Sequence, residues 1–150
     1  MAYLLRIIST AATAAARLAS HNKKRGDIMA YDIAIDVNTN DIVLKGGDAL
    51  LIDNAERIAQ QILISLRFWL GEWFLDTRQG VPYLEYILVK NPNEAHIKQV
   101  LTDAIKNVDG VDLVTGMDLS LNRIKRTLIV EYTAKTSAGL LTRKELLGYG

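Results

Sequence analysis

Cysteine is absent from the 150 residues, and histidine occurs only twice, at His21 and His96. The lack of cysteine excludes a disulfide framework, thiolate metal sites, iron–sulfur clusters and a cysteine nucleophile. Two distant histidines without a neighbouring carboxylate cluster do not indicate a metal site. No apolar run approaches the roughly 18 residues that a membrane-spanning helix requires. We therefore predict a globular chain with no metal, no other cofactor and no membrane as a partner.

The chain also lacks a large excess of positive or negative charge, except in its N-terminal residues. Residues 1–28 hold five basic residues and one acidic residue, whereas the other 122 hold 13 basic and 16 acidic residues. A dedicated nucleic-acid binder presents a dense face of Lys and Arg and has a pI well above 9. Neither part of this chain has such a face, so we predict no nucleic-acid partner.

Residues 3–20 are rich in Ala, Leu and Ile, contain neither Gly nor Pro, and predict an amphipathic helix. A secretory signal fits poorly, because Thr and Arg interrupt the apolar run, and a transit peptide is a weak compositional match. The third interpretation is an assembly helix that packs on a partner. Since Met29-Ala30-Tyr31 repeats Met1-Ala2-Tyr3, Met29 could be an alternative start. We divide the chain into a basic, Ala-rich helical arm (1–28) and one domain (29–150).

The rest of the chain alternates between period-2 and helical patterns. The elements that these patterns predict are a strand at 31–37, a hairpin of 42–45 with 49–52 around Gly46-Gly47-Asp48, helices at 53–70 and 91–107, and strands at 111–122 and 128–134. The tail, 137–150, is either an edge strand or a short helix. This order predicts an α+β fold: a small, mostly antiparallel sheet packed against two main helices, with an N-terminal helical extension.

Residues 68–83 contain both Trp, both Phe and one of the two Pro. Such a concentration predicts a connecting loop stiffened by aromatic packing. Glu72, Asp76 and Arg78 are close enough in sequence to form a charge-assisted network, since Arg is the natural bidentate partner of a carboxylate. The loop is therefore the segment most informative about function.

Two sequence words in this loop, Gly71-Glu72-Trp73-Phe74-Leu75-Asp76 and Gly80-Val81-Pro82-Tyr83, resemble the sheath initiators of contractile phage tails. This baseplate-wedge family includes the small W-type wedge proteins and Mu-like tail proteins. The resemblance covers roughly residues 31–134, including 47–52 and 59–62. Many members carry a contiguous Glu-Pro-Arg triplet near this loop. The triplet is absent here, and Glu72 and Arg78 are the candidates for its Glu and Arg.

The resemblance implies a structural, non-enzymatic virion protein of a tail baseplate that is assembled in the host cytoplasm. Such a protein docks on the baseplate wedge and nucleates the tail sheath by offering its C-terminal strands to the first sheath ring. Its implied partners are wedge proteins and the sheath protein, with tail tube or hub proteins as further candidates. The residues predicted to bind partners are Glu72, Trp73, Asp76, Arg78, Gly80, Pro82, Tyr83, Leu128, Val130, Tyr132, Leu140 and Leu141.

Two alternatives belong to other functional classes. One is a regulatory protein-binding module of the same domain type. The other is a peptidoglycan-degrading muramidase that uses Glu72 and Asp76, which would need one carboxyl with a raised pKa in an apolar site. A carboxylate beside Arg78 is instead held ionised. No catalytic set is assembled in the sequence, and we therefore predict no catalytic residues and no enzyme.

Overall fold

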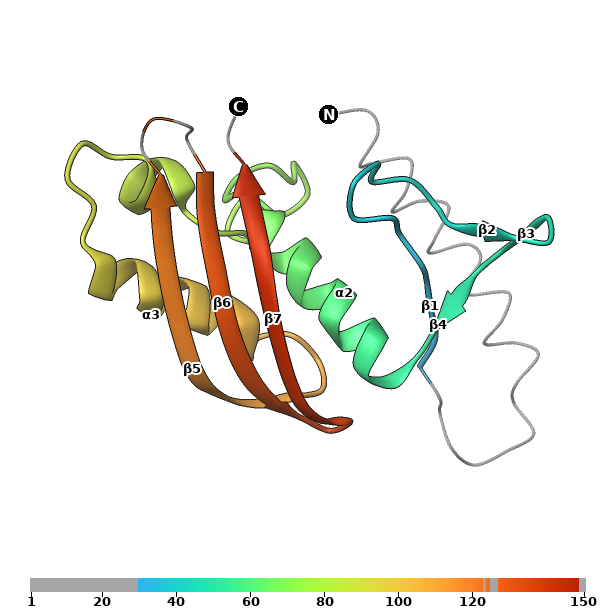
Figure 1. Cartoon of the computed structure of the whole chain (residues 1–150). Coiled ribbons are helices and arrows are strands. Elements are labelled where there is room, and N and C mark those ends of the chain that lie inside the picture. Colours follow the sequence, from blue (N-terminus) through green and yellow to red (C-terminus); the bar gives the residue numbers. More distant parts are fainter. Residues whose placement is uncertain (1–29, 123, 125–126, 149–150) are drawn as a thin grey trace. The chain divides into compact units, whose positions relative to one another are not determined.

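The computed structural model describes residues 30–122, 124 and 127–148 (Figure 1). The chain divides into two compact units between Gln60 and Gln61, inside helix α2 (Asn54–Arg67). The predicted N-terminal arm and Met29 lie outside the described residues.

The first unit carries four short strands in two antiparallel pairs. Strand β1 (Asp32–Ile33) pairs with β4 (Leu51–Ile52), and β2 (Leu44–Lys45) pairs with β3 (Asp48–Ala49). The β2–β3 connection is the pair of glycines 46 and 47, both of which have positive φ. The turn predicted at Gly46-Gly47 is confirmed, but the strands beside it are shorter than predicted, and residues 51–52 of the predicted second strand pair with β1 instead.

The strand predicted over 31–37 is too long, because β1 ends at Ile33. After Ile33 the backbone pairing passes from β4 to an isolated bridge between Ile35 and Ile42, and Asp36 then turns the chain. Its Oδ1 accepts hydrogen bonds from the backbone N–H of Asn38 (2.8 Å) and of Thr39 (3.0 Å). A side chain that captures the following backbone donors builds a turn in competition with the strand.

Helix α2 ends at Arg67 instead of at the predicted Leu70. Within the first unit, Gln60 ties this helix to the segment that contains β1. Its Oε1 accepts from Ile35 N (2.8 Å) and its Nε2 donates to Ile33 O (2.8 Å). These two bonds satisfy a backbone N–H and a backbone C=O of that segment with one side chain of the helix.

The second unit is built on a three-stranded antiparallel sheet in the order β5-β6-β7. The strands are β5 (Val111–Asn122), β6 (Thr127–Thr136) and β7 (Gly139–Gly148). Ten successive residue pairs join β6 to β7 without interruption, whereas the β5–β6 register shifts twice near the start of β5. The tail of the chain is therefore a strand, and the alternative of a helix at 140–147 is wrong.

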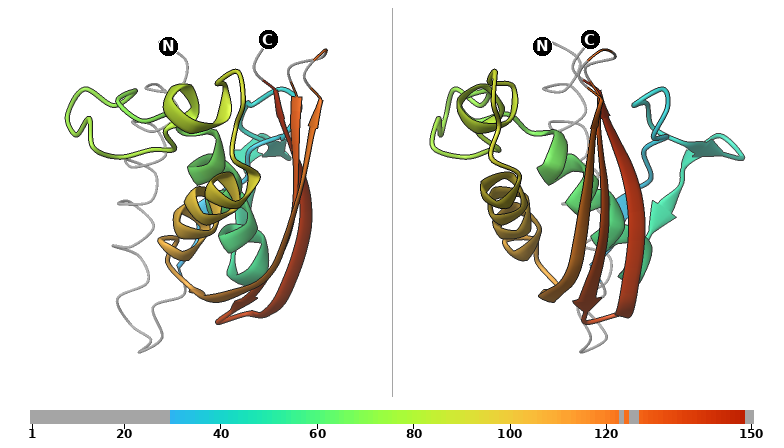
Figure 2. Two further views of the ribbon diagram at one scale, coloured as in Figure 1. Left: turned by 90° about the vertical axis from the view of Figure 1, so that its left-hand side faces the viewer. Right: turned by 60° about the vertical axis from the view of Figure 1, so that its left-hand side comes forward.

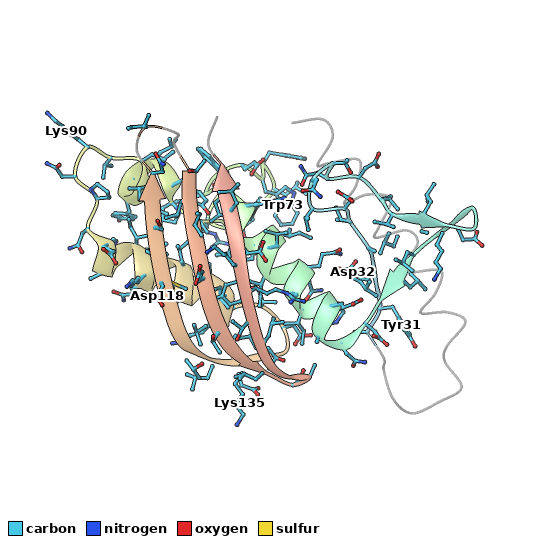
Figure 3. All side chains as sticks on the ribbon, in the orientation of Figure 1. Tyr31, Asp32, Trp73, Lys90, Asp118 and Lys135 are labelled. Carbon is cyan, nitrogen blue, oxygen red and sulfur yellow. The ribbon has the colours of Figure 1, made fainter. Side chains whose placement is uncertain are left out.

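Helix α3 (Glu94–Lys106) and the part of α2 from Gln61 lie on the same side of this sheet (Figures 1 and 2). Ser65 Oγ donates to Ala104 O (3.3 Å) and links the two helices. The other face of the sheet carries polar residues, including Asp118 and Lys135 (Figure 3), together with the exposed Leu140 and Leu146. The apolar core of the unit is formed by Ile62, Leu63, Leu66, Val81, Tyr83, Ile87, Ile97, Leu101, Ile105, Val108, Leu128, Val130, Tyr132, Ala134, Leu141 and Leu147.

Helix α3 begins at Glu94, three residues later than the start predicted at 91. Asn93 is the N-cap, and its Oδ1 accepts from Ala95 N (3.0 Å) and His96 N (3.3 Å). Asn91 and Pro92, the first residues of the predicted helix, therefore precede the cap. The predicted α+β class with antiparallel sheets is confirmed.

Candidate interaction surface

The aromatic loop is closed at its base by backbone pairing between its two ends. Val81 N donates to Phe68 O (2.7 Å), and Leu70 N donates to Val81 O (3.0 Å). This pairing draws the chain away from the axis of α2 immediately after that helix ends. Residues 71–80 therefore project as one connected loop from a fixed base (Figure 2).

Gly80 is required by the close approach of the two ends. Its φ is +109°, and a Cβ placed on it would lie 2.4 Å from Trp69 C and O and 2.6 Å from Leu70 N. Such distances to backbone atoms cannot be relieved by rotating a side chain. The Gly of the Gly-Val-Pro-Tyr word is therefore explained by backbone packing, which makes Gly80 a supporting residue of the loop.

Glu72 and Arg78 do not form the ion pair predicted from the sequence. Glu72 Oε2 instead accepts from Trp69 N (3.1 Å), and Glu72 N donates to Trp69 O (3.1 Å), so this residue closes the first turn of the loop. Arg78 Nε donates to Asp76 Oδ1 at 3.0 Å. The predicted three-residue network is therefore an Asp76–Arg78 pair. The Glu72 carboxylate belongs to a separate turn, because it accepts its hydrogen bond from Trp69, three residues earlier.

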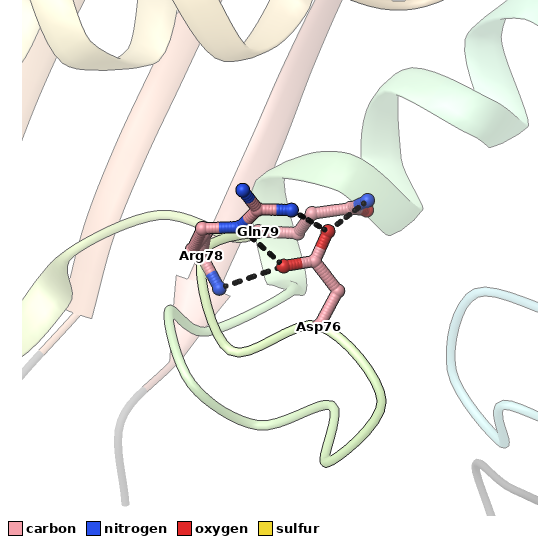
Figure 4. A network of polar contacts seen from close by, with 3 residues as sticks. All are labelled: Asp76, Arg78 and Gln79. Carbon is pink, nitrogen blue, oxygen red and sulfur yellow. Dashed lines mark hydrogen bonds and ion pairs between the residues drawn. The ribbon is translucent and has the colours of Figure 1, made fainter.

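Asp76 is the acceptor at the centre of the loop (Figure 4). Besides Arg78 Nε, it accepts from Arg78 N (3.2 Å), from the Arg78 terminal nitrogen Nη2 (3.4 Å) and from Gln79 Nε2 (3.2 Å). The Arg78 side chain, and then its backbone N–H, hold the pKa of Asp76 below its ordinary value. The ionised Asp76 therefore holds Arg78 and Gln79 through hydrogen bonds inside the loop.

The aromatic residues of the loop have two different roles. Tyr83 is buried, donates its hydroxyl to Leu66 O, and lies with its ring 5.3 Å from that of Trp69. Tyr83 also begins the π-helical turn η1 (Tyr83–Ile87), whereas Trp73 and Pro82 are half-buried. Tyr83 is thus an anchor of the loop inside the unit and presents no surface to a partner.

The tip of the loop and the turn after it expose large apolar side chains that the sequence-based site had omitted. Phe74 is 70% exposed, Leu75 69% and Leu84 69%. Isolated exposed apolar residues are common, but adjacent ones on a hydrogen-bonded loop are typical of interaction surfaces. The pair Phe74-Leu75 follows Trp73 directly, and this position next to a predicted site residue is the signal that could have identified it. A shallow depression lies beside the base of the loop and is lined by Trp69, Leu70, Gly71 and Glu72.

The C-terminal residues predicted to bind partners divide between two locations. Leu128, Val130 and Tyr132 lie on the central strand β6 and are 1% exposed or less, so their side chains form core. Leu140 and Leu141 lie on β7, where Leu140 is 72% exposed and Leu141 is buried. Consecutive residues of a strand face opposite sides of the sheet, which explains the difference. Only Leu140 of these five presents its side chain to solvent.

Strand β7 also carries two charges on its core-facing side. Arg143 is the register partner of Tyr132, and Glu145 is the partner of Val130. Burial raises the pKa of Glu145 above its ordinary value, an effect opposed by Arg67 and Arg143. These charges were missed because the sequence left open whether the tail is a strand, and without strand pairing their face could not be assigned.

Within the residues that the structure describes, no group of His, Cys, Asp and Glu could hold a metal ion. No helix among those residues is long and apolar enough to cross a membrane.

Comparison with known proteins identifies the family of this chain. No curated protein matches the chain significantly. The family model described as contractile injection system sheath initiator matches residues 31–139, which include the aromatic loop, the sheet through the start of β7, and both helices. The match covers well over half of the chain and agrees with the resemblance carried by the loop words. The chain belongs to the sheath initiator family of contractile injection systems, a family of structural proteins of contractile tails.

Proposed function

We propose that this chain docks on the baseplate wedge through the aromatic loop and nucleates the tail sheath through the free edge of β7. The observation that carries the proposal is the position of β7 at the end of its sheet. Among the described residues, no strand pairs with its second edge. A sheet edge of this kind binds an added strand through backbone hydrogen bonds, while alternate side chains give selectivity.

The geometry of the β6–β7 hairpin identifies the backbone groups available to that strand. Thr136 and Gly139 are register partners across a two-residue turn. In such a hairpin the closing pair is hydrogen-bonded, and every second residue directs its N–H and C=O to the opposite edge. On β7 the outward-directed residues are Leu140, Thr142, Lys144 and Leu146.

Strand β5 is the other edge of the sheet and is less suited to accept a strand. Its pairing with β6 shifts register between Val111 and Leu113 and again between Val114 and Gly116. Bulges of this kind twist an edge and interrupt the regular spacing of its backbone groups. The uninterrupted register of β7 therefore favours β7 as the edge offered to the first sheath ring.

The loop supports docking because it presents apolar side chains on a fixed backbone. Phe74 and Leu75 are its exposed contacts, and the Asp76–Arg78 pair with the Glu72 turn holds the conformation that presents them. A surface ordered before binding loses less conformational entropy on association. Of the predicted site residues here, we assign Trp73 and Arg78 to contact with the wedge, and Gly80, Pro82 and Tyr83 to support.

The test is a proline substitution on the outward edge of β7. Thr142→Pro removes an N–H that points away from β6, which an edge strand tolerates. Thr142→Val is the matched control: it retains that N–H and loses the hydroxyl that contacts Thr133 Oγ1 at 3.1 Å. Deleting the strand would be uninformative, because Leu141 and Leu147 are part of the core.

Baseplates assembled with each variant are mixed with purified sheath protein, and sheath growth is counted by electron microscopy. We expect the Thr142→Val baseplates to start sheaths and the Thr142→Pro baseplates to start none. Leu146→Pro probes a second outward position in the same way. Normal sheath growth on both proline variants, with thermal unfolding unchanged, would refute the edge-strand mechanism.

A further inference from the structure

The two charges on the core-facing side of β7 are arranged so that two copies of the strand, paired antiparallel, would place opposite charges against each other. Arg143 and Glu145 stand two residues apart on the same face, between the buried Leu141 and Leu147. Rotating the strand by 180° about an axis through Lys144, perpendicular to the sheet, exchanges the positions of Arg143 and Glu145. The same rotation exchanges Leu141 and Leu147.

We propose that a second copy of this chain pairs with β7, strand against strand and antiparallel, with Arg143 of one copy opposite Glu145 of the other. In this register Leu141 lies opposite Leu147, and Lys144 lies opposite Lys144. Residues 140–148 are paired, which is nine of the ten residues of β7. Two three-stranded sheets then become one six-stranded sheet around a twofold axis, the commonest symmetry of homodimers.

Backbone geometry and charge together select this register. Shifting one strand by an odd number of residues would place its outward-directed N–H and C=O groups opposite residues whose own groups already bond to β6. The same shift would also place the core-facing side chains of one copy opposite the solvent-facing side chains of the other. A shift of two residues sets either Arg143 opposite Arg143 or Glu145 opposite Glu145. Like charges directly opposite each other destabilise an antiparallel pair, whereas opposite charges contribute favourably. The one like-charge pair in the proposed register, Lys144 with Lys144, is moderated because each Lys144 contacts Glu131 of its own chain.

The dimer occupies the same backbone groups that the proposed function assigns to a sheath strand. Its role in regulating sheath growth therefore rests on the proposed function. A pairing of nine residues per copy is at the small end of specific interfaces, so the association is weak and reversible. The free chain would keep its edge covered, and a sheath strand held at high local concentration on the baseplate would displace the second copy. Such a device limits sheath growth away from baseplates and protects an exposed edge from aggregation.

Charge reversal on the purified chain tests the pairing. Dissociation constants are measured by sedimentation equilibrium up to about 100 µM, a range that reveals weak dimers. We expect the wild type to dimerise, R143E and E145R each to weaken the dimer at least tenfold, and the double reversal to recover affinity to within about threefold, since it restores opposite charges across the interface. Asp112→Lys, a charge reversal at an exposed position of β5 away from Glu131, is the matched control and should leave the dimer unchanged.

The absence of cysteine allows the register to be tested directly. Residues opposite each other in an antiparallel pair have Cα atoms about 4.5–5.5 Å apart, within the range that a disulfide bridges. Lys144→Cys should therefore form a covalent dimer under mild oxidation: two thiols lose two protons and two electrons to the oxidant, such as diamide, and form one S–S bond. Thr142→Cys lies opposite Leu146 of the other copy and should not cross-link to itself.

A wild-type chain that stays monomeric at 100 µM, a double reversal no tighter than the single ones, or cross-linking at 142 in place of 144 would each overturn the proposal. These measurements use no sheath or baseplate. A monomeric chain whose baseplates still nucleate sheath would overturn the dimer and leave the proposed function standing. A dimeric chain whose Thr142→Pro baseplates start sheaths normally would overturn the proposed function alone.

Discussion

Gly80→Ala should be the most destabilising single-methyl change in the aromatic loop. At φ +109° a non-glycine residue is strained by on the order of 1–3 kcal/mol. The added Cβ would also lie 2.4 Å from Trp69 C and O, so the paired backbone at the base of the loop has to move. Overpacking that forces backbone shifts costs roughly 1–3 kcal/mol. We therefore expect Gly80→Ala to lower the free energy of unfolding by about 2–6 kcal/mol.

Gly71→Ala separates the two contributions. Gly71 also has a left-handed φ of +81°, but the nearest atom to a Cβ there is Thr77 O at 4.0 Å. Only the conformational strain applies, and we expect a loss of about 1 kcal/mol. The part of the difference between the two variants that exceeds their difference in backbone strain therefore measures the close approach of Gly80 to Trp69.

Urea unfolding followed by tryptophan fluorescence is the appropriate assay, because Trp69 and Trp73 are the only tryptophans and both lie in this loop. Equal losses of stability for Gly80→Ala and Gly71→Ala would refute the argument from close approach. Stability unchanged in both variants would show that the two ends of the loop do not pair as described.

Three further predictions concern the loop and the edge strand. Arg78→Ala should lower the free energy of unfolding by less than about 1 kcal/mol, because the Arg78 side chain is 88% exposed, yet weaken wedge binding in pull-down assays; a large loss of stability would contradict this. The double variant Phe74→Ser and Leu75→Ser should unfold at the wild-type temperature in calorimetry and fail to join wedges, and normal incorporation would remove the tip from the docking surface. Because burial raises the pKa of Glu145, the folded chain binds more protons than the unfolded chain just above pH 4.5, so its contribution to stability falls as pH rises through that window. Urea titrations of dilute protein should show this slope in the wild type and not in Glu145→Gln, and identical slopes would assign it to another group.

The pattern of residues along the chain predicted most elements, because each depends on neighbours in sequence. The alternation of 111–122 became β5 with the predicted limits, and the Gly46-Gly47 turn became the β2–β3 hairpin. Errors arose where a side chain captures nearby backbone groups. Asp36 turns the chain inside the strand predicted over 31–37, and Asn93 caps α3 within the helix predicted from 91.

The candidate site was predicted in its location but not in its internal contacts. The aromatic loop was identified from composition alone, yet the partner of Arg78 is Asp76 and not the whole acidic set, because Glu72 closes a turn with Trp69. The exposure of Phe74 depends on which ring fills the core beneath the loop. Tyr83 is the ring that is buried there, and sequence spacing alone does not distinguish it from Phe74.

By itself the sequence determined the order of strands and helices, the hairpin turns and the loop words that mark the family. Those features depend on residues a few positions apart, whose spacing sets periodicity, turn conformation and capping. Only the tertiary structure decided that β6 is central and β7 is an edge. Tyr132 is therefore core, while Arg143 and Glu145 lie on a strand whose second edge pairs with no strand among the described residues. Strand order arises from pairing between segments far apart in the chain, and the composition of a single strand does not reveal which of its neighbours will be missing.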